Sequence, residues 1–259
     1  MSLDFLPVEL VALLGAGFWH AAIVFLRTAA IVSTLPAIGE VFVPTPVKLA
    51  MAFVFTMIVA PMVPLQPPPD TILSYVGLAV SEAMVGLALG FAVRIFVLTL
   101  QTAGAIGAQG TSLAQAFGGL GAEPMPAIGS ILVFGGTALA VIMGLHIKVI
   151  EYMAQSYLMF PVGEFPPASE LSRWIVQRVS QSFSMSFALA APFVITSVIY
   201  NITLGFINRA MPQLMVAFVG APVITFGGMF IMLVASPMIL MHWVEVFFTF
   251  FANPTGGAQ

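Results

Sequence analysis

The stretch TILSYVGLAVSEAMVGLALGFAVRIFVLTL, residues 71–100, decides the fold class of this chain. Its charged side chains are limited to Glu82 and Arg94, and the other residues are almost all apolar or small. A transmembrane helix needs about 20 predominantly apolar residues, so this run is long enough to cross a bilayer with a tilt. The stretch therefore predicts a membrane-spanning helix.

The composition extends that prediction to the whole molecule. Of its 259 residues, 60% are hydrophobic and 7% are charged, and the mean hydropathy is +1.10. A soluble domain has about 25% charged residues, so this chain lacks the polar side chains to cover a water-exposed surface. The sequence predicts an all-α integral membrane protein of about five to seven hydrophobic helices, some of them kinked. They are expected to form a single polytopic membrane domain over residues 1–259.

Apolar runs and the breaks between them outline the expected helices. Besides residues 71–100, the runs cover residues 8–35, 47–63, 128–145 continuing to 158, 183–207 and 214–251. Stretches that contain Pro, most of them rich in Pro or Gly, separate most of these runs, at residues 36–46, 64–70, 161–167 and 208–213. The last run is too long for one span, so it predicts a hairpin or a kinked helix. Residues 252–259 are expected to form a flexible tail.

Residues 101–129 differ in character from the runs on either side, because they are rich in Gly, Ala, Gln, Ser and Thr. This composition is too polar for a lipid-facing helix and too apolar for a solvated linker. Irregular backbone at membrane depth is tolerated only where it is buried in protein or lines a cavity. Gln101, Gly104, Gln109 and Gly110 therefore fit two alternatives equally well. One is a plug-like loop that moves aside from a passage, and the other is a tight helix–helix contact through small residues.

Ionisable residues inside the apolar runs need partners, because a charged side chain at the bilayer centre costs about 2.5–3.5 kcal/mol on insertion scales. Glu82 and Arg94 lie about 18 Å apart along a straight helix, so they cannot pair with each other. We expect each of them, and also Arg27, to pair with a group on another helix or another chain; the alternative is an ion or proton path. Lys and Arg residues near segment ends do not alternate between loops, so the sequence predicts no orientation.

The reactive side chains argue against an enzyme, a metal site and a nucleic-acid binder. The chain has no Cys, and His20, His146 and His242 form no HExxH pair. The stretch GTSLA, residues 110–114, begins like a serine-nucleophile turn but lacks the closing Gly of that motif. Scattered single charges and a net charge of −3 offer no basic patch. We expect no catalytic residue, no cofactor, no bound metal and no nucleic acid.

Five groups of residues follow one another along the chain with a characteristic spacing. They are Arg27, Pro36, Gly39, Val43, Pro44, Val47 and Lys48; Glu82, Gly86, Gly90 and Arg94; Gln101, Gly104, Gln109, Gly110, Ala116 and Phe117; Gly144, His146, Ser156, Pro161 and Gly163; and NRAMPQLMV, residues 208–216, with Val219, Gly220 and Pro222. Together they resemble motifs of the flagellar biosynthetic protein FliR family, the export-gate subunits of type III secretion. The resemblance covers residues 8–250 of the chain.

The resemblance implies a function in protein export. Members of the family are membrane subunits of the export gate of a flagellum or an injectisome, and they assemble with P- and Q-type partners into a hetero-oligomer. The channel of this gate conducts unfolded protein substrates. The resemblance therefore implies a multi-pass protein of the bacterial inner membrane, at the flagellar basal body or the injectisome base. Its other contacts would be membrane lipid and further membrane proteins of the export apparatus.

The resemblance also implies roles for single residues. Those expected to anchor helices or subunits are Arg27, Glu82, Arg94 and Arg209. Those expected to have structural roles in the family motifs are Pro36, Gly39, Pro44, Gly86, Gly90, Pro212, Gln213 and Gly220. By the same analogy, residues 101–126 become the plug-like loop of the gate, and Phe117 becomes its seal.

Replacing Phe117 with alanine or glycine is expected to raise ion leak through the assembled gate while leaving assembly intact. A smaller side chain at the seal would fill the passage less completely. The conductance of membranes that contain the complex measures the leak, and the yield of the complex measures assembly. Unchanged leak in a fully assembled complex would rule out the plug.

A secondary transporter is the alternative function, with broken helices that form a substrate site near the midplane of the membrane. It predicts two related halves with matching breaks, and the sequence shows no convincing internal repeat. A membrane enzyme is a third reading, which the lack of paired nucleophiles and metal ligands disfavours.

Overall fold

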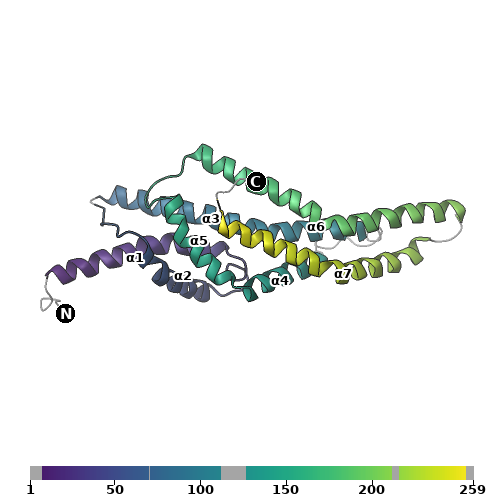
Figure 1. The fold of residues 1–259 in the computed structure, drawn as a ribbon, viewed down its shortest axis with the longest axis horizontal. Helices are drawn as coiled ribbons and strands as arrows, with labels where there is room; N and C mark the ends of the chain where they lie inside the picture. The colour runs from purple at the N-terminus through teal and green to yellow at the C-terminus, as the bar shows by residue number, and fades with distance from the viewer. Residues whose placement is uncertain (1–7, 70, 112–126, 212–215, 255–259) are drawn as a thin grey trace. The chain divides into compact units, whose positions relative to one another are not determined.

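The computed structural model describes residues 8–69, 71–111, 127–211 and 216–254, and every regular element in these ranges is helical (Figure 1). The elements are α1 (Val8–Thr34), α2 (Thr45–Val59), the 3₁₀ turn η1 (Ala60–Met62), α3 (Ile72–Thr111), α4 (Ala127–Ile142), α5 (Leu145–Met159), α6 (Ala168–Ala210) and α7 (Val216–Ala252). The prediction of an all-α protein is confirmed.

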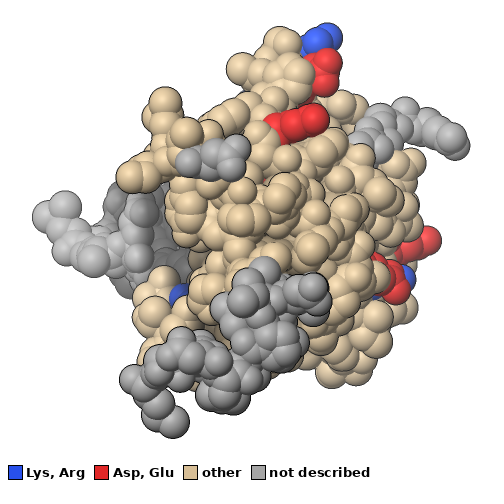
Figure 2. All heavy atoms as spheres, turned by 90° about the vertical axis from the view of Figure 1, so that its left-hand side faces the viewer, with Lys and Arg blue, Asp and Glu red and all other residues tan. Residues whose placement is uncertain are grey.

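Several of these helices are long and apolar enough to cross a membrane. Five qualify singly, within residues 15–34, 45–62, 72–109, 168–210 and 223–252. α4 and α5 qualify only as a bent pair, which raises the number to six. Charged side chains are also sparse on the face drawn in Figure 2, which carries Lys, Arg, Asp and Glu at only a few places. The predicted range of hydrophobic helices is therefore confirmed.

The described residues form two compact units, each built from segments that are distant in sequence. The first unit takes its residues from the described parts of 1–94 and 253–259 and from 144–176. Within it, α1 packs against α2, and α2 packs against α5. Large buried side chains fill its interior, among them Ile23, Leu35, Phe55, Leu89 and Tyr152. Close packing of these side chains holds the helices of the unit together.

The second unit takes its residues from the described parts of 95–143 and 177–252. Within it, α4 packs against α7. Trp243 of α7 is fully buried, and its indole Nε1–H donates to the carbonyl oxygen of Phe96 at 2.8 Å. The ring of Phe247 lies 5.0 Å from that of Phe96 and 4.9 Å from that of Trp243. A buried indole N–H usually has a hydrogen-bond partner, and the carbonyl oxygen of Phe96 is that partner for Trp243.

Helix α3 continues through Thr111 and α4 begins at Ala127, so the loop predicted for residues 101–129 is wrong for residues 101–111 and 127–129. The small residues there serve helix packing. A Cβ atom on Gly104 would lie 2.6 Å from the backbone nitrogen of Gly129, which belongs to the first turn of α4. Close backbone approach of this kind is what glycine permits between membrane helices. Residues 112–126 of the predicted loop lie outside the described residues.

Helix α7 is continuous from Val216 to Ala252, so the hairpin considered for residues 214–251 is wrong. This run contains several Gly and Pro residues but few polar side chains that would satisfy the backbone groups of a turn. A helix satisfies those groups internally, which is the less costly solution in lipid. Helix α6 likewise continues through Pro192, whose carbonyl oxygen accepts a hydrogen bond from Thr196 Oγ1 at 2.8 Å.

Candidate functional site: a buried arginine–glutamate network

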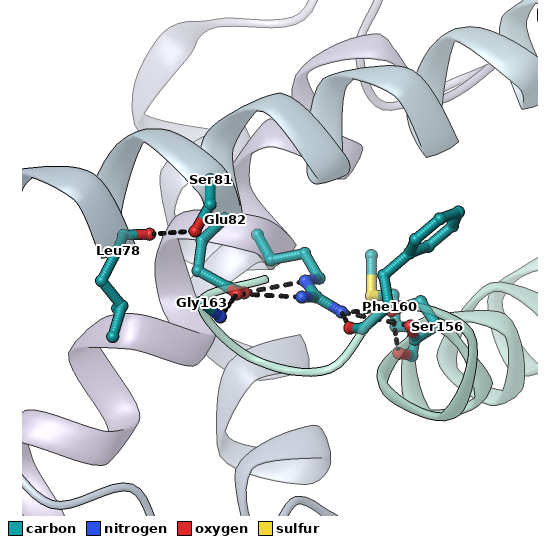
Figure 3. A network of polar contacts seen from close by, with 8 residues as sticks. Leu78, Ser81, Glu82, Ser156, Phe160 and Gly163 are labelled. Carbon is teal, nitrogen blue, oxygen red and sulfur yellow. Dashed lines mark hydrogen bonds and ion pairs between the residues drawn. The ribbon is translucent and has the colours of Figure 1, made fainter. Parts of the chain in front are cut away.

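Arg27 of α1 and Glu82 of α3 form a bidentate ion pair inside the first unit (Figure 3). Arg27 Nε donates to Glu82 Oε2 at 2.8 Å, and Arg27 Nη2 donates to Glu82 Oε1 at 2.9 Å. Each side chain is only 1% exposed. The planar guanidinium fork matches the carboxylate geometry, and burial removes the competition from water that weakens exposed pairs.

The remaining donors of Arg27 reach the C-terminal end of α5. Its Nη1 lies 2.9 Å from the carbonyl oxygen of Phe160, 3.2 Å from that of Ser156 and 3.3 Å from Ser156 Oγ. The guanidinium carbon also lies 3.9 Å from the centroid of the Tyr157 ring. The last carbonyls of a helix lack partners within the helix, and that end carries a partial negative charge. A cation is therefore stabilised at this end of α5.

The Glu82 carboxylate receives a further hydrogen bond from the turn that follows α5. The backbone N–H of Gly163 donates to Glu82 Oε1 at 3.1 Å (Figure 3). In the same turn the N–H of Glu164 donates to the carbonyl oxygen of Pro161 at 3.3 Å, and Gly163 has a φ of +78°. A positive φ at the third position of a turn favours glycine. This turn therefore directs a backbone N–H at a buried carboxylate.

Gly86 and Gly90 of α3 let the backbone of α1 come close enough for the ion pair to form. A Cβ atom on Gly86 would lie 2.6 Å from the carbonyl oxygen of Arg27 and 2.7 Å from Ala30 Cβ. A Cβ atom on Gly90 would lie 3.1 Å from Ile31 Cα. Residues four apart share one face of a helix, so the spacing Glu82, Gly86, Gly90 puts the acid and the two small residues on the same side of α3.

Removing one member of this network costs more free energy than the intact network contributes to stability. Burying two charges costs several kcal/mol per ion, which the pair offsets only when its geometry is good and its other donors and acceptors are satisfied. In this network the Glu82 carboxylate accepts three hydrogen bonds, and Arg27 donates to two side chains and two backbone carbonyls. Removing one partner would leave the other as an uncompensated buried charge. The network thus ties α1, α3, the end of α5 and the following turn to one another.

A second ion pair fastens the turn between α1 and α2 to α3. Arg94 Nη1 lies 2.6 Å from Glu40 Oε1, and Arg94 Nη2 lies 3.2 Å from Glu40 Oε2. These side chains are 26% and 17% exposed, so this pair is less buried than the first. In the same turn Lys48 Nζ donates to the carbonyl oxygen of Gly39 at 3.0 Å. Pro44 precedes the first residue of α2, where a missing N–H and a fixed φ are compatible with a helix start.

Comparison with known protein families identifies the group to which this architecture belongs. The sequence profile of the family described as bacterial export proteins, family 1, matches residues 18–250. The chain belongs to this family.

The relatives of this export-protein chain agree with the match. The chain is 32% identical over 229 residues to the flagellar biosynthetic protein FliR of Caulobacter vibrioides, which covers 87% of this chain and 91% of the relative. It is 30% identical over 224 residues to FliR of Escherichia coli, with 86% and 84% covered. FliR of Bacillus subtilis is 25% identical over 232 residues, with 88% and 89% covered. The resemblance expected from the sequence motifs is confirmed.

In this member of the export-protein family, three of the predicted anchors lie in ion pairs. Arg27 pairs with Glu82, and Arg94 pairs with Glu40. Arg209 is exposed near the C-terminal end of α6, and its anchoring role stays a prediction. Pairing, which was favoured over an ion or proton path, is the arrangement that the geometry shows for these side chains.

The other predicted positions are spread over the two units and the undescribed ranges. Gln101 is half-buried, Gly104 is buried at the contact with α4, Gln109 is exposed, and Gly110 belongs to the last turn of α3. Pro36 is buried directly after α1, and the backbone of Gly220 belongs to α7. Phe117, Pro212 and Gln213 lie outside the described residues, so their roles and that of the plug stay predictions.

Sequence reasoning missed some partners of the two ion pairs. Glu40 stands in a Pro- and Gly-rich turn, where a charged residue is ordinary, so its pairing with Arg94 left no local signal. Phe160 takes part through a backbone carbonyl, which any residue type supplies. Ser156 and Gly163 stood in the family motifs, but only the fold shows that both converge on the Arg27–Glu82 pair.

Gly163→Ala is expected to destabilise this export-family protein by about 1–2 kcal/mol, because an L-residue at a φ of +78° is strained. Space is not the cause, since a Cβ atom would be in ordinary contact with Leu78 at 3.5 Å. Gly163→Asn is expected to cost less, because Asn adopts this backbone conformation more readily. Thermal unfolding of the detergent-purified variants measures the difference. Equal midpoints for both variants and the wild type would show that the turn is not constrained.

Arg94→Gln is expected to cost no more than about 1 kcal/mol, because the Arg94–Glu40 pair is partly exposed. Glu40→Gln and the double variant complete a cycle that isolates the coupling between the two side chains. The free energy of unfolding in denaturant is the measured quantity. A coupling free energy as large as that of a fully buried pair would contradict this prediction, because the Arg94–Glu40 pair is more exposed than the Arg27–Glu82 pair.

Proposed function

We propose that this chain is a membrane subunit of the type III protein-export gate, and that it assembles with P- and Q-type partners to form the channel for unfolded export substrates. The observation that carries the proposal is membership of a bacterial export-protein family over residues 18–250. The relatives compared are flagellar biosynthetic proteins, which favours a flagellar system over an injectisome. The proposed location is the bacterial inner membrane, at the base of the flagellum.

The surface of the described residues supports assembly with lipid and other subunits. Large apolar side chains are exposed along α2, α6 and α7, among them Met57, Phe206, Phe226, Leu233 and Met238. A soluble monomer rarely exposes large contiguous apolar patches, so such surfaces indicate membrane or subunit contact. Helices that meet partner subunits in a membrane must also have a fixed shape. The Arg27–Glu82 network supplies that rigidity inside the first unit.

Arg209 fits a role toward a partner subunit. It lies one residue before the end of α6 and is exposed, whereas Arg27 and Arg94 are paired within their own unit. An intramembrane or interfacial cation faces protein or water, so an acidic group or a helix C-terminus of a partner is the proposed contact.

The transporter alternative gains no support. It requires matching broken helices in two related halves. In the part of the chain that the structure describes, α4 and α5 are the one pair of helices with such a bend.

The function is tested by deleting the gene for this chain from its own bacterium and measuring flagellar proteins in the culture medium. Export is expected to stop, to leave flagellar proteins inside the cell, and to return when the wild-type chain is expressed from a plasmid. A plasmid without insert is the control. Undiminished export in the deletion strain would contradict the proposal.

A further inference from the structure

A proline-rich segment, VPLQPPP at residues 63–69, connects η1 to α3 within the first unit. Val63 is extended, with a φ of −102° and a ψ of 137°, and residues 64–69 run on without a turn or a bend. Proline fixes its own φ and restricts the residue before it to extended backbone. Such runs adopt the left-handed polyproline II helix, which has no internal hydrogen bonds. The segment is therefore stiff, and its backbone groups need partners elsewhere.

Two side chains of α1 bind the backbone of this segment. The N–H of Gln66 donates to His20 Nδ1 at 3.3 Å, and Trp19 Nε1–H donates to the carbonyl oxygen of Pro67 at 3.3 Å. Because His20 Nδ1 accepts, Nε2 carries the ring proton and donates to the carbonyl oxygen of Ala60 at 2.9 Å. Trp19 and His20 are both buried, so water does not compete for these contacts. The segment is thus held in one conformation by the fold of its own chain.

The side chains of the segment are mostly exposed even though its backbone is held. The exposed residues are Pro64, Leu65, Pro67 and Pro68. A polyproline II helix has three residues per turn, so Pro64 and Pro67 lie on the same side of it. The segment falls between the candidate membrane spans at residues 45–62 and 72–109. It therefore lies outside both helices, where a soluble domain can reach it.

Proteins recognise polyproline II segments with grooves that are lined by aromatic side chains. We propose that residues 64–69 are a docking segment for a protein partner with such a groove, and that Trp19 and His20 are positioning residues for it. Ordering a flexible segment costs free energy on binding, and the contacts from α1 remove that cost in advance. Residues 63–69 include no charged side chain, so recognition rests on packing against the proline rings. Such docking is independent of the proposed export function.

Photo-crosslinking of the full chain in its own bacterium tests this contact. Leu65, which is 60% exposed, is replaced with the photoreactive amino acid p-benzoylphenylalanine, and whole cells are irradiated. The same replacement of Val41, which is 97% exposed in the turn between α1 and α2, is the matched control. A protein adduct is expected from position 65, and Pro67→Ala/Pro68→Ala is expected to lower its yield about ten-fold. The control adducts are expected to stay unchanged, and the amount of chain in the membrane is measured for each variant.

A synthetic peptide, MVPLQPPP of residues 62–69, distinguishes proline recognition from general apolar contact. Added in excess to solubilised membranes before irradiation, it is expected to lower the adduct yield from position 65 about five-fold. A peptide with alanine in place of every proline is expected to leave the yield unchanged. This measurement leaves the chain itself unaltered, so it also decides the matter if the double alanine variant fails to fold.

Trp19→Phe tests the positioning role. Phenylalanine keeps a ring beside Tyr75, whose ring centroid lies 4.4 Å from that of Trp19, but it lacks the N–H that binds the Pro67 carbonyl. The adduct yield from position 65 is expected to fall about three-fold, the effect of one lost hydrogen bond. The free peptide should then compete at a lower concentration, because the attached segment binds more weakly. An unchanged yield with unchanged competition would rule out positioning by Trp19.

The docking role is overturned if position 65 gives no protein adduct or adducts with lipid alone. A protein adduct that responds neither to the proline peptide nor to the double alanine variant would overturn it as well. In the supporting case, mass spectrometry of the crosslinked peptides places the attachment site on the partner next to aromatic residues. An attachment site on an aliphatic membrane helix of the partner would instead show ordinary helix packing and contradict a proline-binding groove.

Discussion

Arg27→Met is expected to lower the stability of the protein by about 3–5 kcal/mol, which leaves little folded chain in the membrane. The substitution preserves much of the apolar stem but leaves Glu82 buried with only the Gly163 N–H as a charge-stabilising donor. It also removes the cation that the C-terminal carbonyls of α5 contact. The yield of monodisperse protein in detergent, together with its unfolding in denaturant, measures the effect.

Arg173→Met is the matched control for Arg27→Met. Arg173 is exposed on α6, and its Nε donates to the carbonyl oxygen of Ser169 within the same helix. We expect a change within about 0.5 kcal/mol for this variant. The double variant Arg27→Met/Glu82→Leu should recover part of the lost stability, because it removes the unpaired charge. If Arg27→Met behaves like Arg173→Met, the buried network does not stabilise the fold.

Gly86→Ala is expected to destabilise the protein by about 1–3 kcal/mol, because the added methyl group overpacks the contact between α1 and α3. Its Cβ atom would lie 2.6 Å from the carbonyl oxygen of Arg27, so the backbone of α1 must move and carry the ion pair with it. The same substitution at Gly77 of α3 is the control, since nothing lies within 4 Å of a Cβ atom there.

Gly77→Ala should stabilise α3 by about 0.5–1 kcal/mol, because alanine restricts the unfolded chain and glycine does not. The two substitutions on one helix are thus expected to have opposite signs. Thermal unfolding in detergent distinguishes them. Stabilisation by Gly86→Ala would show that α1 and α3 are not held at the close distance seen here.

The sequence was sufficient for the class of the protein and for most helix positions. The run over residues 71–100 falls within α3, and the Pro- and Gly-rich stretch over residues 36–46 falls between α1 and α2. These features are local, since apolar length and missing backbone donors act on the chain where they occur. The need of Arg27, Glu82 and Arg94 for partners was also predictable, because the cost of an unpaired charge in a membrane does not depend on the fold.

The identity of the partners was not predictable from the sequence. Arg27 and Glu82 are separated by the whole of α2, and Glu40 lies in a Pro- and Gly-rich turn whose pattern predicts no partner for it. For residues 101–111 the composition fitted a loop and a tight helix–helix contact equally well, because both use small and polar residues; the structure shows the helix, so the loop expected from the resemblance is wrong there. Gly104 of this run approaches Gly129 of α4, a contact between residues distant in sequence that no local pattern reveals.

Native mass spectrometry of the detergent-purified particle, from cells that co-express the tagged chain with its P- and Q-type partners, tests the proposed assembly most directly. A defined hetero-oligomer that contains this chain and both partners is the expected result. A lone monomer or homodimer of this chain, with both partners present in the membrane but unbound, would contradict the export-gate assembly.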